Sequence, residues 1–303
     1  MLIELERKYN EKSFGGLISK GSRILTDAGI ENARAEARML MVEYTKKDLA
    51  ALYSELDEIV DDFTAMRYMK GIRKRAKHYP FQYILGYTYF MDYKFICREK
   101  VLIPRFDTEN LVLHALELSP GRNAKVLDMC TGSGCIGISY KLFREKEGYQ
   151  DEVYMLDISD DAISLAGENS VKLGANVHII KSDLFAAFES LCDKDRTIPE
   201  KDRFDLIISN PPYIRSKEIN NLVKDVRDYE PRLALDGAAD GLMFYRRIIS
   251  EAPKYLKEDG RLCFEIGCEQ YAAVSELMRA AGFKHIKKLR DMSGLDRVVS
   301  GVL

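Results

Sequence analysis

The sequence predicts a doubly wound α/β fold with a mostly parallel sheet, preceded by a small bundle of helices. From residue 124 onward, short apolar runs rich in Val, Ile and Leu alternate with helical segments. A glycine-rich turn follows the first of these runs, and residues 1–80 show helical spacing without strand alternation. Alternating strands and helices are typical of a Rossmann-like sheet with helices on both faces.

Length and composition indicate a globular protein. The chain has 303 residues, 46% of them hydrophobic and 31% charged, which suits one large domain or two ordinary ones. No apolar run is long enough to span a membrane, and the N-terminal segment MLIELERKYNEKSFGG is charged where a signal peptide would be apolar. We therefore expect a cytoplasmic protein with no membrane contact.

The net charge of −2 argues against a nucleic-acid binder, and the cysteine spacing argues against a metal-binding protein. A dedicated binder of duplex DNA or RNA usually has a strong basic excess, so no stable nucleic-acid partner is expected. The four histidines are scattered, and there is no Cys-x-x-Cys pair and no HExxH. We expect no metal, and free thiols at Cys97, Cys130, Cys135, Cys192, Cys263 and Cys268.

The first 80 residues predict a helical bundle. The segment 30–45 places five side chains on one helical face, namely Ala33, Ala37, Leu40, Met41 and Tyr44. A second amphipathic helix is predicted at 61–79, and Pro80 ends it. The basic run at 73–77 is either a solvated helix face or a contact for a partner or RNA.

A linker and a larger domain follow the helices. Residues 81–97 alternate aromatic and polar side chains around Gly86, which predicts a β-hairpin. We therefore divide the chain into a helical domain at 1–80, a β-hairpin linker at 81–104 and the α/β domain at 105–303.

The α/β domain contains apolar runs that predict strands at 124–129, 152–157, 177–183, 203–210 and 261–266. Helices are predicted between them, including 161–174 and 269–282. The last two runs, 285–291 and 296–303, are expected to form an antiparallel pair at the edge of an otherwise parallel sheet.

The segment VLDMCTGSGCIG, 126–137, combines a strand, a glycine turn and the start of a helix. Gly132, Gly134 and Gly137 fit the G-x-G-x-x-G spacing of dinucleotide sites, although glycines that only permit a tight turn would look the same. Asp157 ends the next strand, where a carboxylate can accept both hydroxyl groups of a ribose. Asp157 could instead cap the following helix, but Ser159 and Asp160 are better placed for that role.

Asp128 distinguishes between two kinds of nucleoside ligand. It lies just before the glycine turn, where a carboxylate would repel a pyrophosphate and attract a cation. S-adenosylmethionine carries an ammonium and a sulfonium and no phosphate, so the sequence favours it over a dinucleotide. Asp183 ends the third strand and is placed either to accept from the adenine amino group or to cap the next helix. Leu184 is placed to pack on the adenine ring.

The segment ISNPPYI, 208–214, ends the fourth strand in the crevice where such sheets bind ligands. Methyl transfer to an amide or aromatic amine requires the N–H groups to be held, so that the delocalised lone pair points at the methyl group. The Asn210 oxygen and a backbone carbonyl near Pro211 would accept these N–H groups, and Tyr213 would stack on a planar target. Alternatively, the prolines only terminate a strand.

Four motifs in this order, DMCTGSG, LDIS, SDLF and SNPPY, resemble those of class I S-adenosylmethionine-dependent methyltransferases that act on amino groups. NPPY is shared by amino methyltransferases of DNA, some rRNA methyltransferases and the glutamine methyltransferases of release factors. Further segments resemble the PrmC/HemK family over nearly the whole chain, namely 80–95, 102–112, 225–248, 264–267 and 296–299.

The resemblance implies a class I methyltransferase that methylates the glutamine of the Gly-Gly-Gln motif in class I peptide-chain release factors, with S-adenosylhomocysteine as the second product. The helical domain and the hairpin would help to dock the release factor. Taken with the assignments above, the expected cofactor-binding residues are Asp128, Cys130, Thr131, Gly132, Ser133, Gly134, Asp157, Asp183, Leu184 and Asn210. The expected substrate-binding residues are Arg105, Glu109, Asn210, Pro211, Pro212 and Tyr213, and Asn210, Pro211 and Tyr213 would be catalytic.

Two positions depart from the family pattern. Cys130 stands where the family usually has Gly, and Phe106 stands where it usually has Pro. If the first position needs a positive φ, a cysteine there is costly. Arg105 and Glu109 match the family motif, but a surface ion pair between them at helical spacing is the alternative interpretation.

Two other functions stay open at this point. An amino methyltransferase acting on DNA or rRNA bases would need a basic groove or a target-recognition domain, which neither the net charge nor the sequence indicates. A non-catalytic module that binds S-adenosylmethionine or the translation apparatus would not need an intact Asn-Pro-Pro-Tyr. We therefore expect a monomeric, metal-independent methyltransferase.

Overall fold

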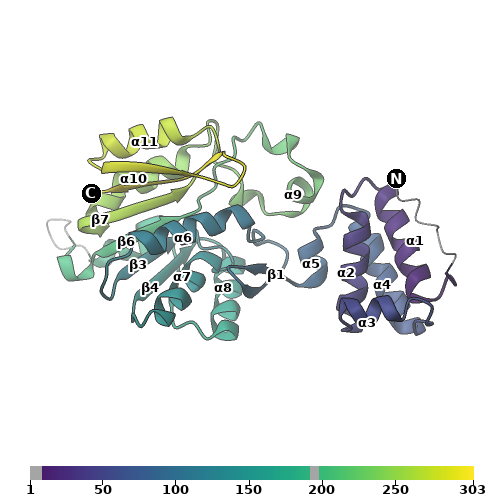
Figure 1. Cartoon of the computed structure of the whole chain (residues 1–303). Helices are drawn as coiled ribbons and strands as arrows, with labels where there is room; N and C mark the ends of the chain where they lie inside the picture. The colour runs from purple at the N-terminus through teal and green to yellow at the C-terminus, as the bar shows by residue number, and fades with distance from the viewer. Residues whose placement is uncertain (1–8, 192–197) are drawn as a thin grey trace. The chain divides into compact units, whose positions relative to one another are not determined.

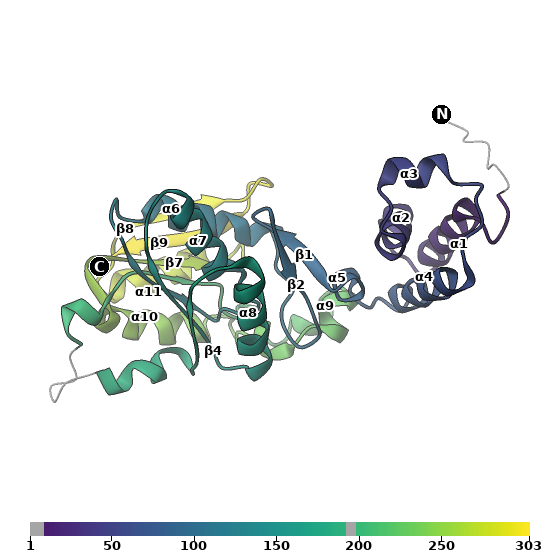
Figure 2. The ribbon, with the colours of Figure 1, turned by 90° about the horizontal axis from the view of Figure 1, so that it is seen from below.

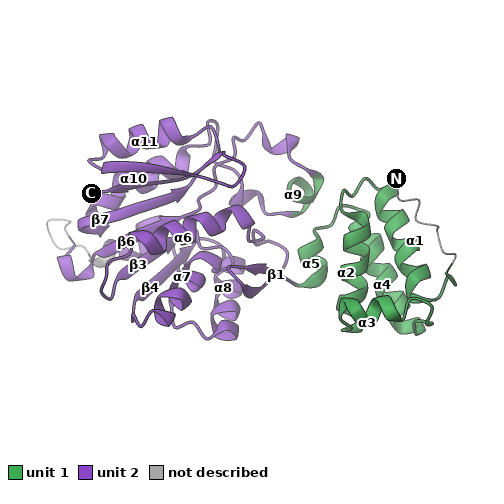
Figure 3. Ribbon diagram, in the orientation of Figure 1, with its two compact units in different colours: residues 1–86, 224–229 green, residues 87–223, 230–303 purple. Residues whose placement is uncertain are grey.

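The computed structural model describes residues 9–191 and 198–303, which form two compact units (Figure 3). One unit contains the chain up to Gly86 together with 224–229, and the other contains 87–223 and 230–303. The predicted hairpin segment 81–97 is therefore divided, with 81–86 in the smaller unit and 87–97 in the larger one. Cys192, one of the six cysteines, lies outside the described residues. None of the described helices is long and apolar enough to cross a membrane.

The smaller unit is a helical bundle, as the sequence predicts. Its helices are α1 (Phe14–Asp27), α2 (Ala33–Thr45), α3 (Leu49–Ser54), α4 (Asp62–Arg75), α5 (Phe81–Leu85) and α9 (Lys224–Tyr229). Side-chain caps define three helix starts, because Ser13, Asp48 and Asp61 each accept a hydrogen bond from a backbone N–H in the first turn. Four residues of the predicted apolar face of α2 are buried, and Tyr44 is half-buried.

The basic run at 73–77 is only partly a solvated face. Its central residue, Arg75, is buried, and its guanidinium donates to Glu36 at 2.5 Å and to Asp225 at 2.6 Å. Asp225 lies on α9 and also contacts the His78 ring at 3.2 Å. Because the chain enters this unit for only six residues at α9, these contacts fix the short segment within the bundle.

The larger unit contains a seven-stranded sheet in the order β5-β4-β3-β6-β7-β9-β8 (Figure 1). Its strands are β3 (Lys125–Met129), β4 (Glu152–Asp157), β5 (His178–Lys181), β6 (Phe204–Ser209), β7 (Leu256–Glu265), β8 (Lys284–Arg290) and β9 (Asp296–Val302). The first five in spatial order are parallel, and β9 is antiparallel to both β7 and β8. The predicted sheet with its antiparallel edge is confirmed.

Helices cover both faces of this sheet (Figures 1 and 2). The helices are α6 (Glu109–Leu118), α7 (Cys135–Lys146), α8 (Asp160–Leu173), α10 (Met243–Tyr255) and α11 (Tyr271–Ala280), and short 3₁₀ turns lie at Phe106–Thr108, Leu184–Leu191, Glu200–Asp202, Ile219–Asn221 and Arg232–Ala234. Side chains of α6, α7 and α8 share one core cluster, whereas α10 and α11 share the other. All six residues of β6 are buried, which explains its largely apolar sequence, FDLIIS.

The segment 81–97 differs from the predicted hairpin because it begins with the helical turn α5. Gly86 ends this turn with a φ of 80°, a left-handed conformation that favours glycine at a helix C-terminus. The hairpin itself then consists of β1 (Tyr87–Phe90) and β2 (Tyr93–Ile96). Its two-residue turn, Met91 and Asp92, has positive φ at both positions, as a tight hairpin turn requires.

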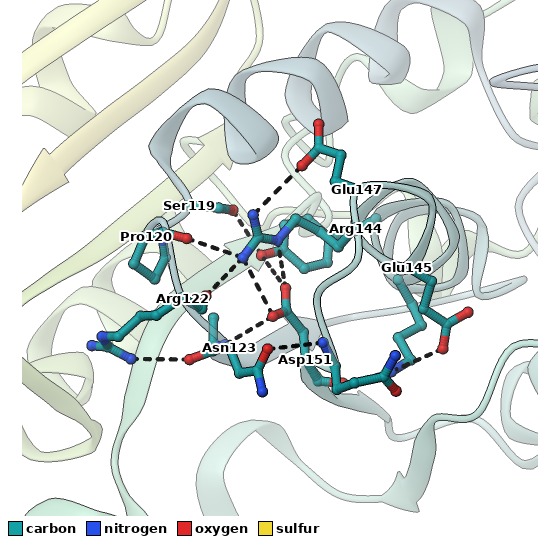
Figure 4. A network of polar contacts seen from close by, with 12 residues as sticks. Ser119, Pro120, Arg122, Asn123, Arg144, Glu145, Glu147 and Asp151 are labelled. Carbon is teal, nitrogen blue, oxygen red and sulfur yellow. Dashed lines mark hydrogen bonds and ion pairs between the residues drawn. The ribbon is translucent and has the colours of Figure 1, made fainter.

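A buried ion pair between Arg144 and Asp151 lies at the amino-terminal ends of β3 and β4 (Figure 4). The Arg144 guanidinium donates to Asp151 at 2.7 Å, and their side chains are 4% and 0% exposed. Arg144 also donates to the carbonyl oxygens of Pro120 and Arg122, and Asp151 accepts the backbone N–H of Ala124 at 2.8 Å. This cluster lies at the opposite edge of the sheet from the strand ends that form the cavity described below.

Candidate active site

The carboxyl ends of four strands meet at one edge of the sheet. Met129 pairs with Leu156 and with Ser209, and Asp157 pairs with Lys181. The segments that follow β3, β4, β5 and β6 therefore lie beside one another and line a cavity of about 450 Å³. This volume lies in the range of small-molecule sites, and the position is the switch point of a doubly wound sheet.

The glycine turn after β3 holds its shape through carboxylates. Gly132 and Gly134 have φ values of 56° and 82°, which glycine adopts without strain. The Gly132 N–H donates to Asp157 at 2.9 Å, and the Gly137 N–H donates to Asp128 at 2.9 Å. Because both amides already face an anion, the turn does not present them to a phosphate. This arrangement supports the choice of a cationic nucleoside over a dinucleotide.

Cys130 has a φ of 62°, so the position does need a positive φ. A non-glycine residue in this region costs about 1–3 kcal/mol, which the surrounding fold must offset. The side chain lines the cavity, and burial raises the pKa of its thiol. The departure from the family glycine therefore adds local strain and removes no polar contact.

The two acidic residues near the turn have different positions. Asp157 lines the cavity, and its carboxylate accepts the N–H groups of Gly132 and Ser159 at 2.9 Å each. Asp128 is fully buried beneath the turn and is not among the lining residues. It accepts the Thr131 hydroxyl at 2.5 Å, and its Oδ1 has no partner among the described residues. Burial raises the pKa of Asp128 to about 7.

Among the remaining expected cofactor residues, the lining residues include Cys130, Thr131, Gly132, Ser133, Asp183, Leu184 and Asn210, whereas Gly134 does not line the cavity. Asp183 pairs with Arg247 of α10 at 2.9 Å. The hydroxyl of Ser182, rather than Asp183, caps the following turn by accepting the Ala187 N–H at 2.9 Å.

Sequence reasoning missed many of the lining residues, and Ile158, Phe244 and Arg247 are three examples. Ile158 directly follows Asp157 in the chain, so its position after a strand end could have indicated it. Phe244 and Arg247 come from α10, and no local pattern shows that this helix lies over the strand ends.

The Asn-Pro-Pro-Tyr segment begins where β6 ends. Asn210 and Pro212 line the cavity, whereas Pro211 and Tyr213 do not. The Asn210 side-chain amide donates to the Thr108 hydroxyl at 3.3 Å. The Tyr213 hydroxyl donates to Glu265 at 3.2 Å. The side chains at both ends of the segment are thus held by hydrogen bonds.

The backbone after this segment is also fixed. Ile214 exchanges hydrogen bonds with Leu235 and Gly237 at 2.9 and 2.8 Å. Gln270 donates to the carbonyl oxygen of Tyr213 at 3.0 Å. A Cβ atom at Gly241 would lie 2.4 Å from this same oxygen, so only glycine permits the close approach.

Arg105 and Glu109 do not pair with each other. Arg105 lines the cavity and its guanidinium donates to Glu230, whose side chain is 1% exposed. Glu109 is outside the lining residues and accepts the backbone N–H of Met91 at 2.7 Å, at the turn of the hairpin. Of these two residues, only Arg105 lies where it can contact a ligand in this cavity. No metal-ligating group of three His, Cys, Asp or Glu side chains occurs in 9–191 and 198–303.

Comparison with known proteins places the chain in a family. Residues 16–86 match the PrmC N-terminal domain, and residues 120–299 match the Methyltransferase domain. The release factor glutamine methyltransferase of Geobacter sulfurreducens is 39% identical over 91% of this chain and 92% of its own length. The protein of the same name from Clostridium botulinum is 38% identical over 93% of this chain and 96% of its own.

The chain belongs to the release factor glutamine methyltransferase family. A solved structure of a release factor-specific protein-(glutamine-N5) methyltransferase from Alicyclobacillus acidocaldarius is 25% identical, with a TM-score of 0.39, and covers 66% of this chain and 93% of its own. Membership makes the chain an enzyme that transfers methyl groups.

Replacing Asp157 with alanine is expected to weaken S-adenosylmethionine binding by at least about 10- to 100-fold, the scale of losing even one of its charge-assisted hydrogen bonds to the ribose hydroxyl groups. Titration calorimetry measures the dissociation constant. Asp160→Ala is the matched control, since this carboxylate is 81% exposed at the start of α8. An unchanged constant for Asp157→Ala, in a variant that melts like the control, would contradict the ribose assignment.

Proposed function

We propose that this chain transfers a methyl group from S-adenosylmethionine to the side-chain amide nitrogen of the glutamine in the Gly-Gly-Gln motif of class I release factors. Family membership supports this assignment. The single observation that carries it is the position of Asn210, whose amide is held at the wall of the cavity beside the glycine turn.

The lining residues fit S-adenosylmethionine. The glycine turn would surround the methionine part, Asp157 would hold the ribose hydroxyl groups, and Leu184 would pack on the adenine. Each oxygen of Asp157 accepts one backbone N–H at present, and a carboxylate oxygen has lone pairs for a second donor. When bound, the cofactor supplies an electrophilic methyl group on a sulfonium.

Asn210 is oriented to accept from a substrate amide. Because its NH₂ group donates to Thr108, its oxygen Oδ1 is left to accept an N–H of the target glutamine. Pro211 has no N–H of its own, and a backbone carbonyl in this segment would accept the second N–H. With both N–H groups held, the nitrogen lone pair points out of the amide plane toward the methyl group.

Positioning then accounts for most of the catalysis. A nitrogen–carbon bond forms as the sulfur–carbon bond breaks, and the nitrogen afterwards loses one proton to solvent. The products are the N-methylated glutamine and S-adenosylhomocysteine. No strong base is required before the transfer, because the lone pair itself attacks the methyl carbon. The sequence-based expectation that Tyr213 stacks on the substrate amide is not kept, because Tyr213 is not among the lining residues; its hydrogen bond to Glu265 would instead hold the segment in place.

We also propose that the helical unit helps to dock the release factor in the cytoplasm, where translation occurs. The match to the PrmC N-terminal domain supports this role. So do two exposed apolar side chains three residues apart on α4, Phe63 and Met66, which are 64% and 61% exposed. We further propose that the protein acts as a monomer. Arg105 would lie near the substrate glutamine.

The decisive experiment is a methyl-transfer assay with labelled S-adenosylmethionine and a purified class I release factor, followed by mass spectrometry of the product. We expect one methyl group on the Gly-Gly-Gln glutamine and none on a release factor in which that glutamine is replaced by alanine. Label on DNA or rRNA, with none on the release factor, would instead favour a nucleic-acid amino methyltransferase.

A further inference from the structure

A buried glutamine holds the far end of the Asn-Pro-Pro-Tyr segment. Gln270 precedes α11 and is 8% exposed. Its Oε1 accepts the Gly267 N–H at 2.9 Å, and its Nε2 donates to the carbonyl oxygens of Tyr213 at 3.0 Å and Gly241 at 3.2 Å. Because one of these backbone groups is a donor and the other two are acceptors, only this orientation of the amide satisfies all three. Gln270 therefore joins the end of the segment to the turn after β7 and to the turn before α10.

The two prolines make the ends of the segment important for its position. Pro211 and Pro212 have no backbone N–H, so this part of the chain cannot be held by donors of its own. Their rings also fix φ, so a displacement at one end of the segment reaches the other end. At the start, the Ser209 hydroxyl donates to the carbonyl oxygen of Met129 at 2.7 Å, which ties the segment to β3. The other end depends on the contacts of Tyr213.

Tyr213 is anchored through both its side chain and its backbone. Its hydroxyl donates to Glu265 at 3.2 Å, and its carbonyl oxygen accepts the Gln270 amide. The surroundings of this oxygen are tightly packed, because a Cβ atom at Gly241 would lie 2.4 Å from it and 2.7 Å from Gln270 Nε2. Neither Tyr213 nor Gln270 lines the cavity, so these contacts act on the segment and not on a ligand.

We propose that Gln270 is a positioning residue that fixes the Tyr213 end of the segment. It thereby fixes the two acceptors for the substrate amide, the Asn210 oxygen and a backbone carbonyl near Pro211. This inference rests on the proposed function, because the position of these acceptors matters only if they hold the N–H groups of a target glutamine. The acceptors must keep the nitrogen lone pair aimed at the methyl carbon, and a shift of about 1 Å is enough to cost roughly 10²-fold in rate.

The first test replaces Gln270 with leucine, an apolar residue of similar size. The carbonyl oxygen of Tyr213 then loses its donor, and the segment can move at that end. We expect kcat for release-factor methylation to fall about 10- to 100-fold. The KM for the release factor and the dissociation constant of S-adenosylmethionine, measured by titration calorimetry, should stay within about threefold of wild type. Glu269→Leu is the matched control, since this neighbouring side chain is exposed, and it should keep the wild-type kcat.

A second pair of variants displaces the same carbonyl oxygen without a change at Gln270. Gly241→Ala places a Cβ atom against the Tyr213 oxygen and should lower kcat to the level of Gln270→Leu. Gly174→Ala is its control, because the φ of Gly174 is 73° against 76° for Gly241, but no described atom lies within 4 Å of the Cβ position. Both alanines have the same unfavourable backbone conformation, so both variants should melt at a lower temperature. Only Gly241→Ala should lose turnover.

The kinetics separate positioning from a purely structural role. Circular dichroism at the assay temperature establishes that each variant is folded. A Gln270→Leu variant that melts at a lower temperature but keeps the wild-type kcat would overturn the proposal, and so would equal kcat values for Gly241→Ala and Gly174→Ala. Either result, with an active wild type, would leave the proposed function intact. A wild type that methylates no release factor would instead contradict the proposed function itself.

Discussion

Replacement of Asn210 by alanine is expected to lower the turnover number for release-factor methylation about 10²- to 10³-fold, the scale of losing one preorganised polar contact to a reacting group. The variant loses the side-chain oxygen that the hydrogen bond between the Asn210 amide and Thr108 leaves available at the cavity. The substrate nitrogen then keeps more than one orientation, and its lone pair points at the methyl group for only part of the time. Single-turnover kinetics with saturating cofactor measures the effect on the chemical step.

Asn221→Ala is the matched control for this variant. Asn221 is exposed at the end of a 3₁₀ turn later in the same connecting segment, and it should keep the wild-type rate. A rate within about threefold of wild type for Asn210→Ala would remove this residue from the mechanism. If Asn210→Ala mainly raises the dissociation constant of S-adenosylmethionine, then Asn210 contributes more to cofactor binding than to substrate positioning.

Periodicity predicted most of the fold because the relevant patterns are local. The apolar face of α2 repeats at helical spacing, and the short apolar run of β6, which ends at two prolines, is typical of a strand covered on both sides. The turn α5 escaped prediction because five residues between Pro80 and Gly86 are too few to distinguish helical spacing from strand alternation. The assignment of α9 to the helical unit was equally unpredictable, since it depends on contacts of Asp225 with residues distant in sequence.

The site could be predicted in part for a similar reason. Residues that follow strand ends, such as Asp157 and Asn210, are located by the topology of a parallel sheet. The sequence does not show whether a carboxylate faces the cavity or supports the turn from beneath, and Asp128 does the latter. No local sequence pattern indicates the position of Glu265, because its contact with Tyr213 joins β7 to the segment after β6.

The second large effect is expected on stability, at the edge of the sheet opposite the cavity. Asp151→Ala should lower the free energy of unfolding by about 3–5 kcal/mol, because it leaves the Arg144 charge buried without its main partner. The backbone N–H of Ala124 and the Tyr140 hydroxyl would lose their acceptor at the same time. Urea denaturation followed by circular dichroism measures the change.

Glu147→Ala provides the control on the same guanidinium. Glu147 lies 3.6 Å from Arg144 but is 59% exposed, so its removal should cost less than about 1 kcal/mol. Replacing both Arg144 and Asp151 with leucine should be less damaging than Asp151→Ala alone, since no unpaired charge stays buried. Similar losses for Asp151→Ala and Glu147→Ala would mean that water reaches the guanidinium and that burial does not control the strength of this pair. Asp151→Ala is therefore expected to destabilise the protein more than Glu147→Ala because of desolvation. Water can replace the exposed Glu147 carboxylate beside the Arg144 guanidinium, but it cannot reach the buried side to replace Asp151.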